Sequence, residues 1–294
     1  MNIFDNIKQS FQQGTSLIKL IYINISVFIV LNLLGIILKL FNLPADYLWF
    51  YLKVPSDLTQ LMYHAWTVIT YMFVHEGFMH IFFNMLCLFW FGKIFLMLFS
   101  EKQLVGLYLI GGLIAALFYI VAFNVFPFYS PIVHQSLMLG ASGSIMAIII
   151  ATAVQSPNME MQLLILGSVK LKYIAIVAVL TSFFGITSDN GGGQLAHLGG
   201  ALAGYLFVVS LRQGKDLTSV MSLILDAIYT LFRPRKLRVK PNPNPRKSTM
   251  NDADFNVNKA RKIAEIDRIL DKIKTSGYES LSTEEKKRLF EQGK

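Results

Sequence analysis

Long runs of apolar residues alternate with short polar segments along most of this chain. Six runs approach the roughly 20-residue length that crosses a membrane as a helix, at 20–41, 78–98, 104–123, 137–155, 171–187 and 194–211. The first run is flanked by Lys19 and Lys39 and has no cleavage site of small residues, so a removable signal peptide is not expected. The pattern predicts an all-α polytopic membrane protein, a bundle of six transmembrane helices.

Composition supports this prediction and shows where the charge lies. Hydrophobic residues make up 54% of the 294 residues and charged residues 15%, and the mean hydropathy is +0.50, far from the values of soluble proteins. The net charge of +9 is uneven: Lys and Arg exceed Asp and Glu by one in residues 1–211 and by eight in residues 212–294. The basic excess therefore belongs to a tail that follows the apolar part.

Lysines also fall on alternate connections between the runs, which predicts the orientation. If the N-terminus is cytoplasmic, the inner segments before residue 212 carry Lys8, Lys19, Lys102, Lys170 and Lys172. The outer segments 42–77, 124–136 and 188–193 then carry only Lys53. By the positive-inside rule both termini are cytoplasmic, and the compact pattern indicates a bacterial cytoplasmic (inner) membrane.

The chain divides by composition into a membrane domain (1–211), an amphipathic helix with a basic linker (212–247) and a small helical module (248–294). Residues 216–232 have one apolar helical face, which suits a helix at the membrane surface. Segment 233–247 has seven basic residues and four prolines, so it predicts an extended linker attracted to anionic lipid by about 1 kcal/mol per basic residue. It lacks the interleaved aromatic residues often used to bind nucleic acid, so no nucleic-acid partner is expected.

Two helices are predicted in the last module, the second of them short. Residues 257–275 form a charged amphipathic pattern that Gly277 ends, and Ser282 and Glu285 have the spacing of a capping box. No catalytic constellation is present in this tail, so a cytoplasmic docking module is expected.

Four polar residues of the membrane domain are predicted to lie at one depth. His80 and Asn84 are in the first turns of the second run, Ser142 near the start of the fourth and His197 near the start of the sixth. These three runs all cross from outside to inside in the predicted orientation. Because polar groups inside a membrane usually face the interior of the bundle, the four side chains are expected to meet just below the outer surface.

Glycines on the fourth and sixth runs favour close contact between them. His197, Gly200 and Gly204 share one helical face, and Gly200 and Gly204 form a GxxxG pair that lets another backbone approach. Gly143, beside Ser142, is the natural counterpart. This contact brings the Ser142 hydroxyl to an imidazole, and a serine becomes a nucleophile when a base takes its proton.

The remaining polar groups suit an anionic intermediate. Asn84 and His80 share a helical face and supply side-chain N–H donors, and the Ser142 amide at a helix N-terminus adds another. Donors of this kind stabilise the negative charge that develops on an attacked carbonyl oxygen.

Together these motifs resemble the rhomboid family of intramembrane serine proteases. The matching elements are "HEGFMHIFFN" (His75, His80, Asn84), "GASG" (Gly140, Ser142, Gly143) and "AHLGGALAG" (His197, Gly200, Gly204). The resemblance covers about residues 18–211. It implies Ser142 as nucleophile, His197 as its base, His80 and Asn84 as oxyanion donors, and His75 as a structural residue that anchors the preceding loop. Family members cleave single-span membrane proteins near the outer face without metal or cofactor.

This chain departs from the family pattern at two positions, and its tail beyond residue 212 lies outside the shared core. Trp66 is followed by Thr67 where the family often has arginine, which concerns the anchoring of the first outer loop at lipid headgroups. Met146 lies one turn after the serine, where an aromatic ring often stacks on the base. Methionine can also pack on a ring.

Other interpretations of the same residues remain open. Ser142 and its glycines can form a packing notch, and a lone intramembrane histidine can belong to a transporter. Asp189 can orient His197 as a third triad member, although a turn is the more usual role of such an Asp. Cys87 is expected to pack, and the spacing of His75 and His80 disfavours a zinc site. The sequence thus predicts an intramembrane serine protease, with a non-proteolytic rhomboid-like scaffold as the alternative, and it leaves the oligomeric state open.

Overall fold

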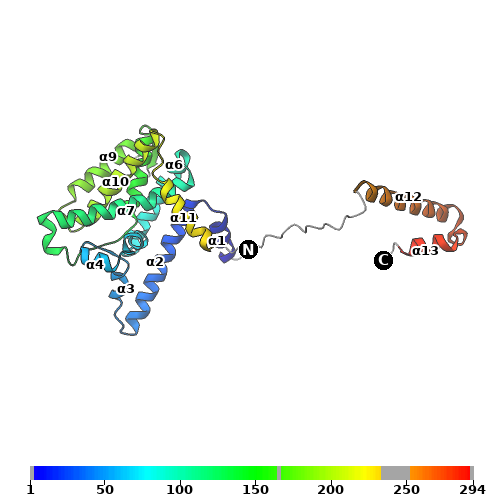
Figure 1. Ribbon diagram of the computed structural model, residues 1–294, viewed down its shortest axis with the longest axis horizontal. Coiled ribbons are helices and arrows are strands. Elements are labelled where there is room, and N and C mark those ends of the chain that lie inside the picture. The colour runs from blue at the N-terminus through cyan, green and yellow to red at the C-terminus, as the bar shows by residue number, and fades with distance from the viewer. Residues whose placement is uncertain (1–2, 164–166, 233–251, 292–294) are drawn as a thin grey trace. The chain divides into compact units, whose positions relative to one another are not determined.

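A computed structural model describes residues 3–163, 167–232 and 252–291. Contacts between residues group the chain into two compact units, Met1–Arg233 and Pro234–Lys294, which Figure 1 shows in one colour ramp. The predicted basic linker 233–247 lies outside the described residues.

Four helices of the described residues are long and apolar enough to cross a membrane. They are α2 (Ser16–Leu40), α6 (Phe78–Leu98), α7 (Glu101–Val125) and α10 (Gly191–Arg212). They coincide with four of the six predicted runs and extend past most of the predicted ends by a few residues.

The other two apolar helices are shorter than predicted. Helices α8 (Ser142–Gln155) and α9 (Leu171–Phe184) have 14 residues each, or about 21 Å at 1.5 Å per residue, against a hydrocarbon core of about 30 Å. The start of the run 137–155 is extended: Leu137–Met138 form strand β2, which pairs antiparallel with β1 (Val54–Pro55). Hydropathy alone does not separate an apolar extended segment from a helix, so the sequence overestimated the length of α8.

Short elements connect these helices, and the two strand pairs among them were not predicted. Strands β3 (Glu160–Leu163) and β4 (Gly167–Lys170) form the second antiparallel pair. Helix α1 (Ile3–Gln13) precedes α2. The remaining connecting elements are α3 (Asp46–Phe50), α4 (Leu58–Tyr63), α5 (Thr67–Thr70), η1 (Tyr71–Phe73) and η2 (Pro127–Ile132).

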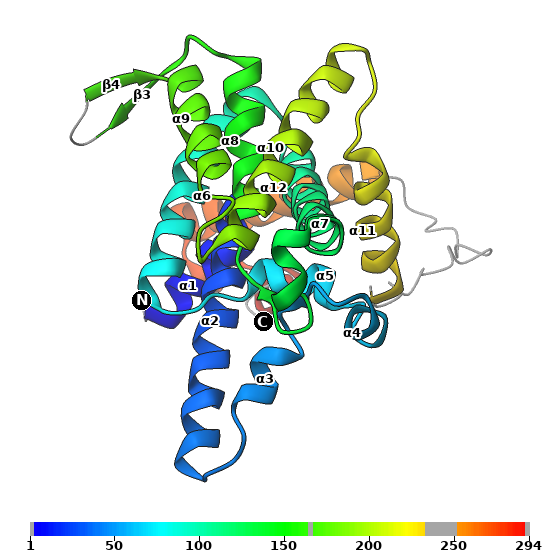
Figure 2. The same ribbon diagram turned by 90° about the vertical axis from the view of Figure 1, so that its left-hand side faces the viewer.

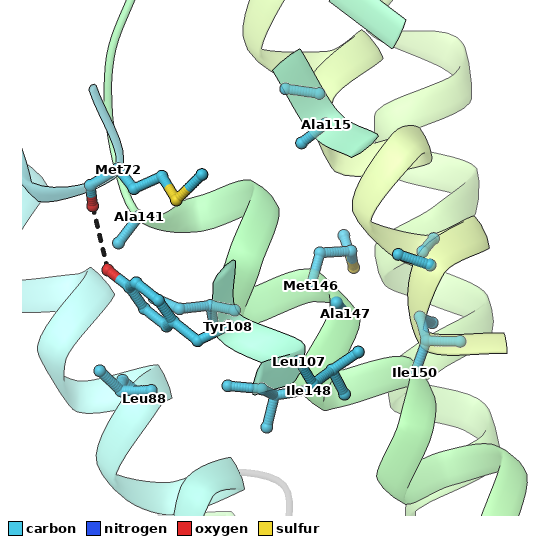
Figure 3. Close-up of a cluster of buried hydrophobic side chains, with 14 of the residues drawn as sticks. Met72, Leu88, Leu107, Tyr108, Ala115, Ala141, Met146, Ala147, Ile148 and Ile150 are labelled. Carbon is cyan, nitrogen blue, oxygen red and sulfur yellow. Dashed lines mark hydrogen bonds between the residues drawn. The ribbon is translucent and has the colours of Figure 1, made fainter. Parts of the chain in front are cut away.

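The core of this unit lies where α7, α8 and α10 pack side by side (Figure 2). Small side chains let the helices approach: Ala115 of α7 and Ala147 of α8 are fully buried at these contacts. Figure 3 shows the larger side chains around them, with the Tyr108 hydroxyl donating to the Met72 carbonyl at 3.0 Å. Apolar side chains of α2 and α9 instead lie on the surface, as Ile36 and Val177 do, which suits contact with lipid.

Helix α11 (Ser219–Phe232) follows α10 and begins against α7. Gln103 donates to the Asp216 carboxylate at 3.0 Å, and Thr218 lies over Gly106, where an added Cβ would meet it at 2.6 Å. The predicted helix at 216–232 is present with a start three residues later, because Asp216 accepts the Thr218 amide in the turn before it.

The second unit contains α12 (Asp252–Ser276), η3 (Tyr278–Ser280) and α13 (Thr283–Glu291). The predicted capping box is present: Glu285 N–H donates to the Ser282 hydroxyl at 3.3 Å, and Ser282 N–H donates to the Glu285 carboxylate at 2.7 Å. Ile269 and Leu281 are buried between these elements.

Candidate active site

Ser142 is the first residue of α8, at a sharp change of backbone direction. Gly140 has φ +117°, a conformation that side chains disfavour, and it lets the chain turn from β2 into the helix. The Gly140 amide donates to the Tyr71 carbonyl at 2.9 Å, which fixes this turn. In the first backbone hydrogen bond of α8, the Ile145 amide donates to the Ala141 carbonyl. The amides of residues 142–144 therefore have no partner within the helix and face outward from its N-terminus.

His197 lies in the second turn of α10, across a seam where two backbones touch. A Cβ added at Gly200 would lie 2.0 Å from the Gly143 carbonyl oxygen, and one added at Gly204 would lie 2.2 Å from that of Ala147. Glycine is therefore required at both positions for α10 to reach α8. The seam holds Ser142 and His197 on facing helices.

Ser142 and His197 line one cavity of about 470 Å³ together with His80 and Asn84 of α6. Cys87 and Met146 line the same cavity, so Cys87 faces the candidate site as well as packing beside it. Three helices that are far apart in sequence thus contribute polar side chains to one volume.

His80 is oriented by the loop before its helix. The Glu76 amide donates to His80 Nδ1 at 3.4 Å, which leaves Nε2 to carry the ring proton in the neutral tautomer. Nε2 faces Gly140: a Cβ built there would lie 3.0 Å from Nε2 and 3.8 Å from the Ser142 hydroxyl. The missing side chain of Gly140 leaves this approach open, so the His80 N–H points toward the space beside the serine.

Asn84 is buried and directs one amide proton to its own helix. Its Nδ2 donates to the His80 carbonyl at 2.9 Å. An amide nitrogen has two protons, and the second has no partner among the described contacts, in a side chain that lines the cavity. Asn84 is therefore a second side-chain donor in the volume that Ser142 lines.

His75 lies behind this cavity. Its ring is fully buried, with its centroid 5.2 Å from that of His80, and its Nδ1 lies 3.3 Å from the Phe73 carbonyl. Burial, followed by the proximity of His80, lowers the pKa of His75 to about 4, so the ring is neutral at physiological pH. His75 packs against His80 from the preceding loop, a position that suits the structural role inferred from sequence.

Other residues considered from sequence lie elsewhere. Asp189 lines a different cavity, with Tyr129 and Ser136, and within the described contacts it makes no hydrogen bond to His197. Thr67 is buried, and its hydroxyl donates to the His64 carbonyl at 2.6 Å in the segment between α2 and α6. No three His, Cys, Asp or Glu side chains of the described ranges group as metal ligands would.

Sequence reasoning missed one residue beside the candidate base. Ser182 of α9 is 2% exposed, and its hydroxyl oxygen lies 3.3 Å from His197 Nδ1. A serine in an apolar helix ordinarily bonds its own i−4 carbonyl, as Ser182 does with Ala178 at 2.9 Å. Its sequence context therefore contains no signal of a second partner.

The fold and this cavity define an integral membrane protein with polar side chains gathered among apolar helices. The model of the Rhomboid domain matches residues 63–214, more than half of the chain. The chain belongs to the rhomboid family. A second family model, described as a family of unknown function (DUF6576), matches residues 250–294, and a search of curated proteins finds no match.

Proposed function

We propose that this protein is an intramembrane serine protease that cleaves single-span membrane proteins near the outer membrane face. The observation that carries the proposal is the shared cavity, where Ser142 at a helix N-terminus meets His197, His80 and Asn84 from two other helices. Membership in the rhomboid family, which includes such proteases, supports the same conclusion.

In the proposed reaction, the Ser142 hydroxyl oxygen attacks a substrate carbonyl and its proton moves to His197. His80, Asn84 and the amides at the start of α8 donate to the resulting oxyanion. The intermediate collapses to an ester on Ser142, and His197 gives its proton to the leaving amine. Water then attacks the ester, with His197 again as base, and releases the acid product.

The membrane arrangement is part of the proposal: six crossings, cytoplasmic termini and a bacterial inner membrane. The short α8 supports it, because a crossing that begins with an extended segment puts the helix N-terminus below the membrane surface. Irregular backbone at that depth must be covered by protein or line a cavity, and both hold here: β2 pairs with β1, and Ser142 lines the cavity.

The tail is proposed to act on the cytoplasmic side. We expect membrane domain 1–211 to contain the protease, 212–247 to contact anionic lipid and 248–294 to dock a partner. No cofactor is required by the proposed chemistry.

Cleavage of a model single-span substrate in liposomes tests the proposal. We expect Ser142→Ala to abolish cleavage and His197→Ala to reduce it by at least about 1,000-fold, since the serine then has no base. Ser144→Ala is the matched control. Ser144 lies two residues after Ser142, about 200° around α8, is buried and has no hydrogen-bond partner for its hydroxyl among the described atoms, so loss of this hydroxyl should leave cleavage unchanged.

Equal cleavage by wild type and Ser142→Ala would contradict the serine mechanism. A wild type that binds several single-span proteins and cuts none would favour the non-proteolytic scaffold. The described contacts include no hydrogen bond between Ser142 and His197, and the scaffold interpretation rests on that observation. Such bonds are often long before substrate binds.

A further inference from the structure

Ser182 joins the candidate base to a third helix. Its hydroxyl oxygen lies 3.3 Å from His197 Nδ1 and 2.9 Å from the Ala178 carbonyl oxygen. The side chain is 2% exposed, and these two groups are its partners among the described contacts. It approaches His197 at Nδ1, so the other ring nitrogen, Nε2, does not contact Ser182.

The positions of the protons follow from these two contacts. A carbonyl oxygen only accepts, so the single proton of the Ser182 hydroxyl points to Ala178. The hydroxyl oxygen then accepts from its other neighbour, and His197 Nδ1 must carry a proton to donate. In a neutral imidazole this leaves Nε2 without a proton and with a free lone pair.

We propose that Ser182 is a positioning residue that holds His197 in the Nδ1–H tautomer, so that Nε2 is the base for Ser142. This inference deepens the proposed function and rests on it. The chain His197 Nδ1–H to Ser182 O–H to Ala178 C=O orients the ring and gives the positive charge formed during proton transfer a buried hydrogen-bond acceptor. Hydrogen bonds shorten and strengthen when the donor becomes charged.

His80 shows the opposite arrangement in the same cavity. Its Nδ1 accepts from the Glu76 amide, so its proton sits on Nε2 and faces Gly140. The partner of His197 Nδ1 is the Ser182 oxygen, which accepts a hydrogen bond from the ring. The partner of His80 Nδ1 is the Glu76 amide, which donates one to the ring. The two neighbours therefore make one histidine a base and the other a donor, as acyl transfer requires.

α9 also offers a matched control. Thr181, the preceding residue, is exposed and lies about 100° around the helix from Ser182. Both residues are small and hydroxylic, and both sit at the same level of the helix. Of these two residues, only Ser182 has a hydrogen-bond contact with His197 in the part of the chain that the structure describes.

The experiment is ¹⁵N NMR of His197 in the full-length protein in lipid bilayers, combined with cleavage kinetics. In wild type we expect a protonated Nδ1 and an unprotonated Nε2. Ser182→Ala should mix the tautomers and lower kcat by about 10-fold to 100-fold with KM unchanged, because the lost bond is to a group that becomes charged. Ser182→Thr keeps a hydroxyl and should restore both the spectrum and kcat, and Thr181→Ala should alter neither.

The NMR spectrum and the cleavage kinetics together separate this inference from the proposed proteolytic function on which it rests. A wild-type spectrum with the proton on Nε2, or one that Ser182→Ala leaves unchanged, would overturn the role of Ser182 even in an active protease. An altered spectrum in a protein that cleaves nothing would support the Ser182 bond and refute the proteolytic function. Loss of kcat with an unaltered spectrum would assign Ser182 to packing alone.

Discussion

Helix α10 meets α8 on one side and α9 on the other, and the two contacts differ in kind. Against α8 the backbone of α10 at Gly200 and Gly204 touches the backbone of α8, and neither glycine has room for a Cβ. Against α9 the contact is made by side chains, and Val177 on the far face of α9 is 62% exposed. The backbone contact controls how far His197 lies from Ser142, whereas the side-chain contact controls which ring nitrogen carries the proton.

The largest effect is expected where the backbone contact is broken. Gly204→Ala places a Cβ 2.2 Å from a main-chain oxygen, and neither backbone can move without separating the helices. We expect a loss of at least about 3 kcal/mol in the free energy of unfolding, the upper end of overpacking effects, together with loss of cleavage. Unfolding in detergent measures the first and the liposome assay the second.

Gly35→Ala in α2 is the control for this substitution. The nearest atom to a Cβ there is the Trp49 ring nitrogen at 4.0 Å, so alanine fits and favours the helix by about 0.5–1 kcal/mol. If both variants lost similar stability, the distinction between the α8–α10 seam and the outer helices would be wrong.

An intermediate effect is expected at a buried polar side chain. The Tyr108 hydroxyl donates to the Met72 carbonyl at 3.0 Å and accepts from the Asn24 amide at 3.2 Å, which ties α7 to η1 and α2. Tyr108→Phe leaves both partners buried without it and should cost about 1–3 kcal/mol of unfolding free energy. Tyr173→Phe, at an exposed ring of α9, should change it by less than about 0.5 kcal/mol. Equal losses in the two variants would mean that the Tyr108 bonds contribute nothing.

The smallest effect concerns a loop contact outside the membrane helices. Asp57 caps α4 by accepting the amides of Thr59 and Gln60 at 2.7 and 3.0 Å, and it also contacts His134. The His134 hydrogen bond, then the Gln60 amide, lowers the pKa of the Asp57 carboxyl. Because the folded pKa is below the unfolded value of about 3.9, the contribution is complete above that value and is lost as the pH falls through the folded pKa.

Hydrogen exchange at the Thr59 and Gln60 amides tests this pH dependence. Protection should fall as the pH drops below about 4, while amides in the α8–α10 seam stay protected. Asp57→Asn keeps an acceptor oxygen but has no charge to lose, so its protection should not follow this titration. A wild type with pH-independent protection in that range would show that the carboxylate charge is not involved.

Much of the fold was predictable because membrane helices are strongly patterned. The run at 78–98 coincides with α6, and the capping box at Ser282 and Glu285 is present as predicted. These features depend on residues close together in the sequence, where hydropathy and cap chemistry act locally. The catalytic roles of Ser142, His197, His80 and Asn84 stay predictions, although all four line one cavity.

What the sequence determined by itself was the set of apolar runs, the residues with chemistry near their ends and the small residues that permit close contact. Tertiary structure decided where α8 starts, because Leu137–Met138 is extended only through its pairing with Val54–Pro55. It also decided the partner of His197, because Ser182 reaches the ring only when α9 packs beside α10. Both depend on contacts between distant segments, and a one-dimensional pattern of hydropathy does not contain such contacts.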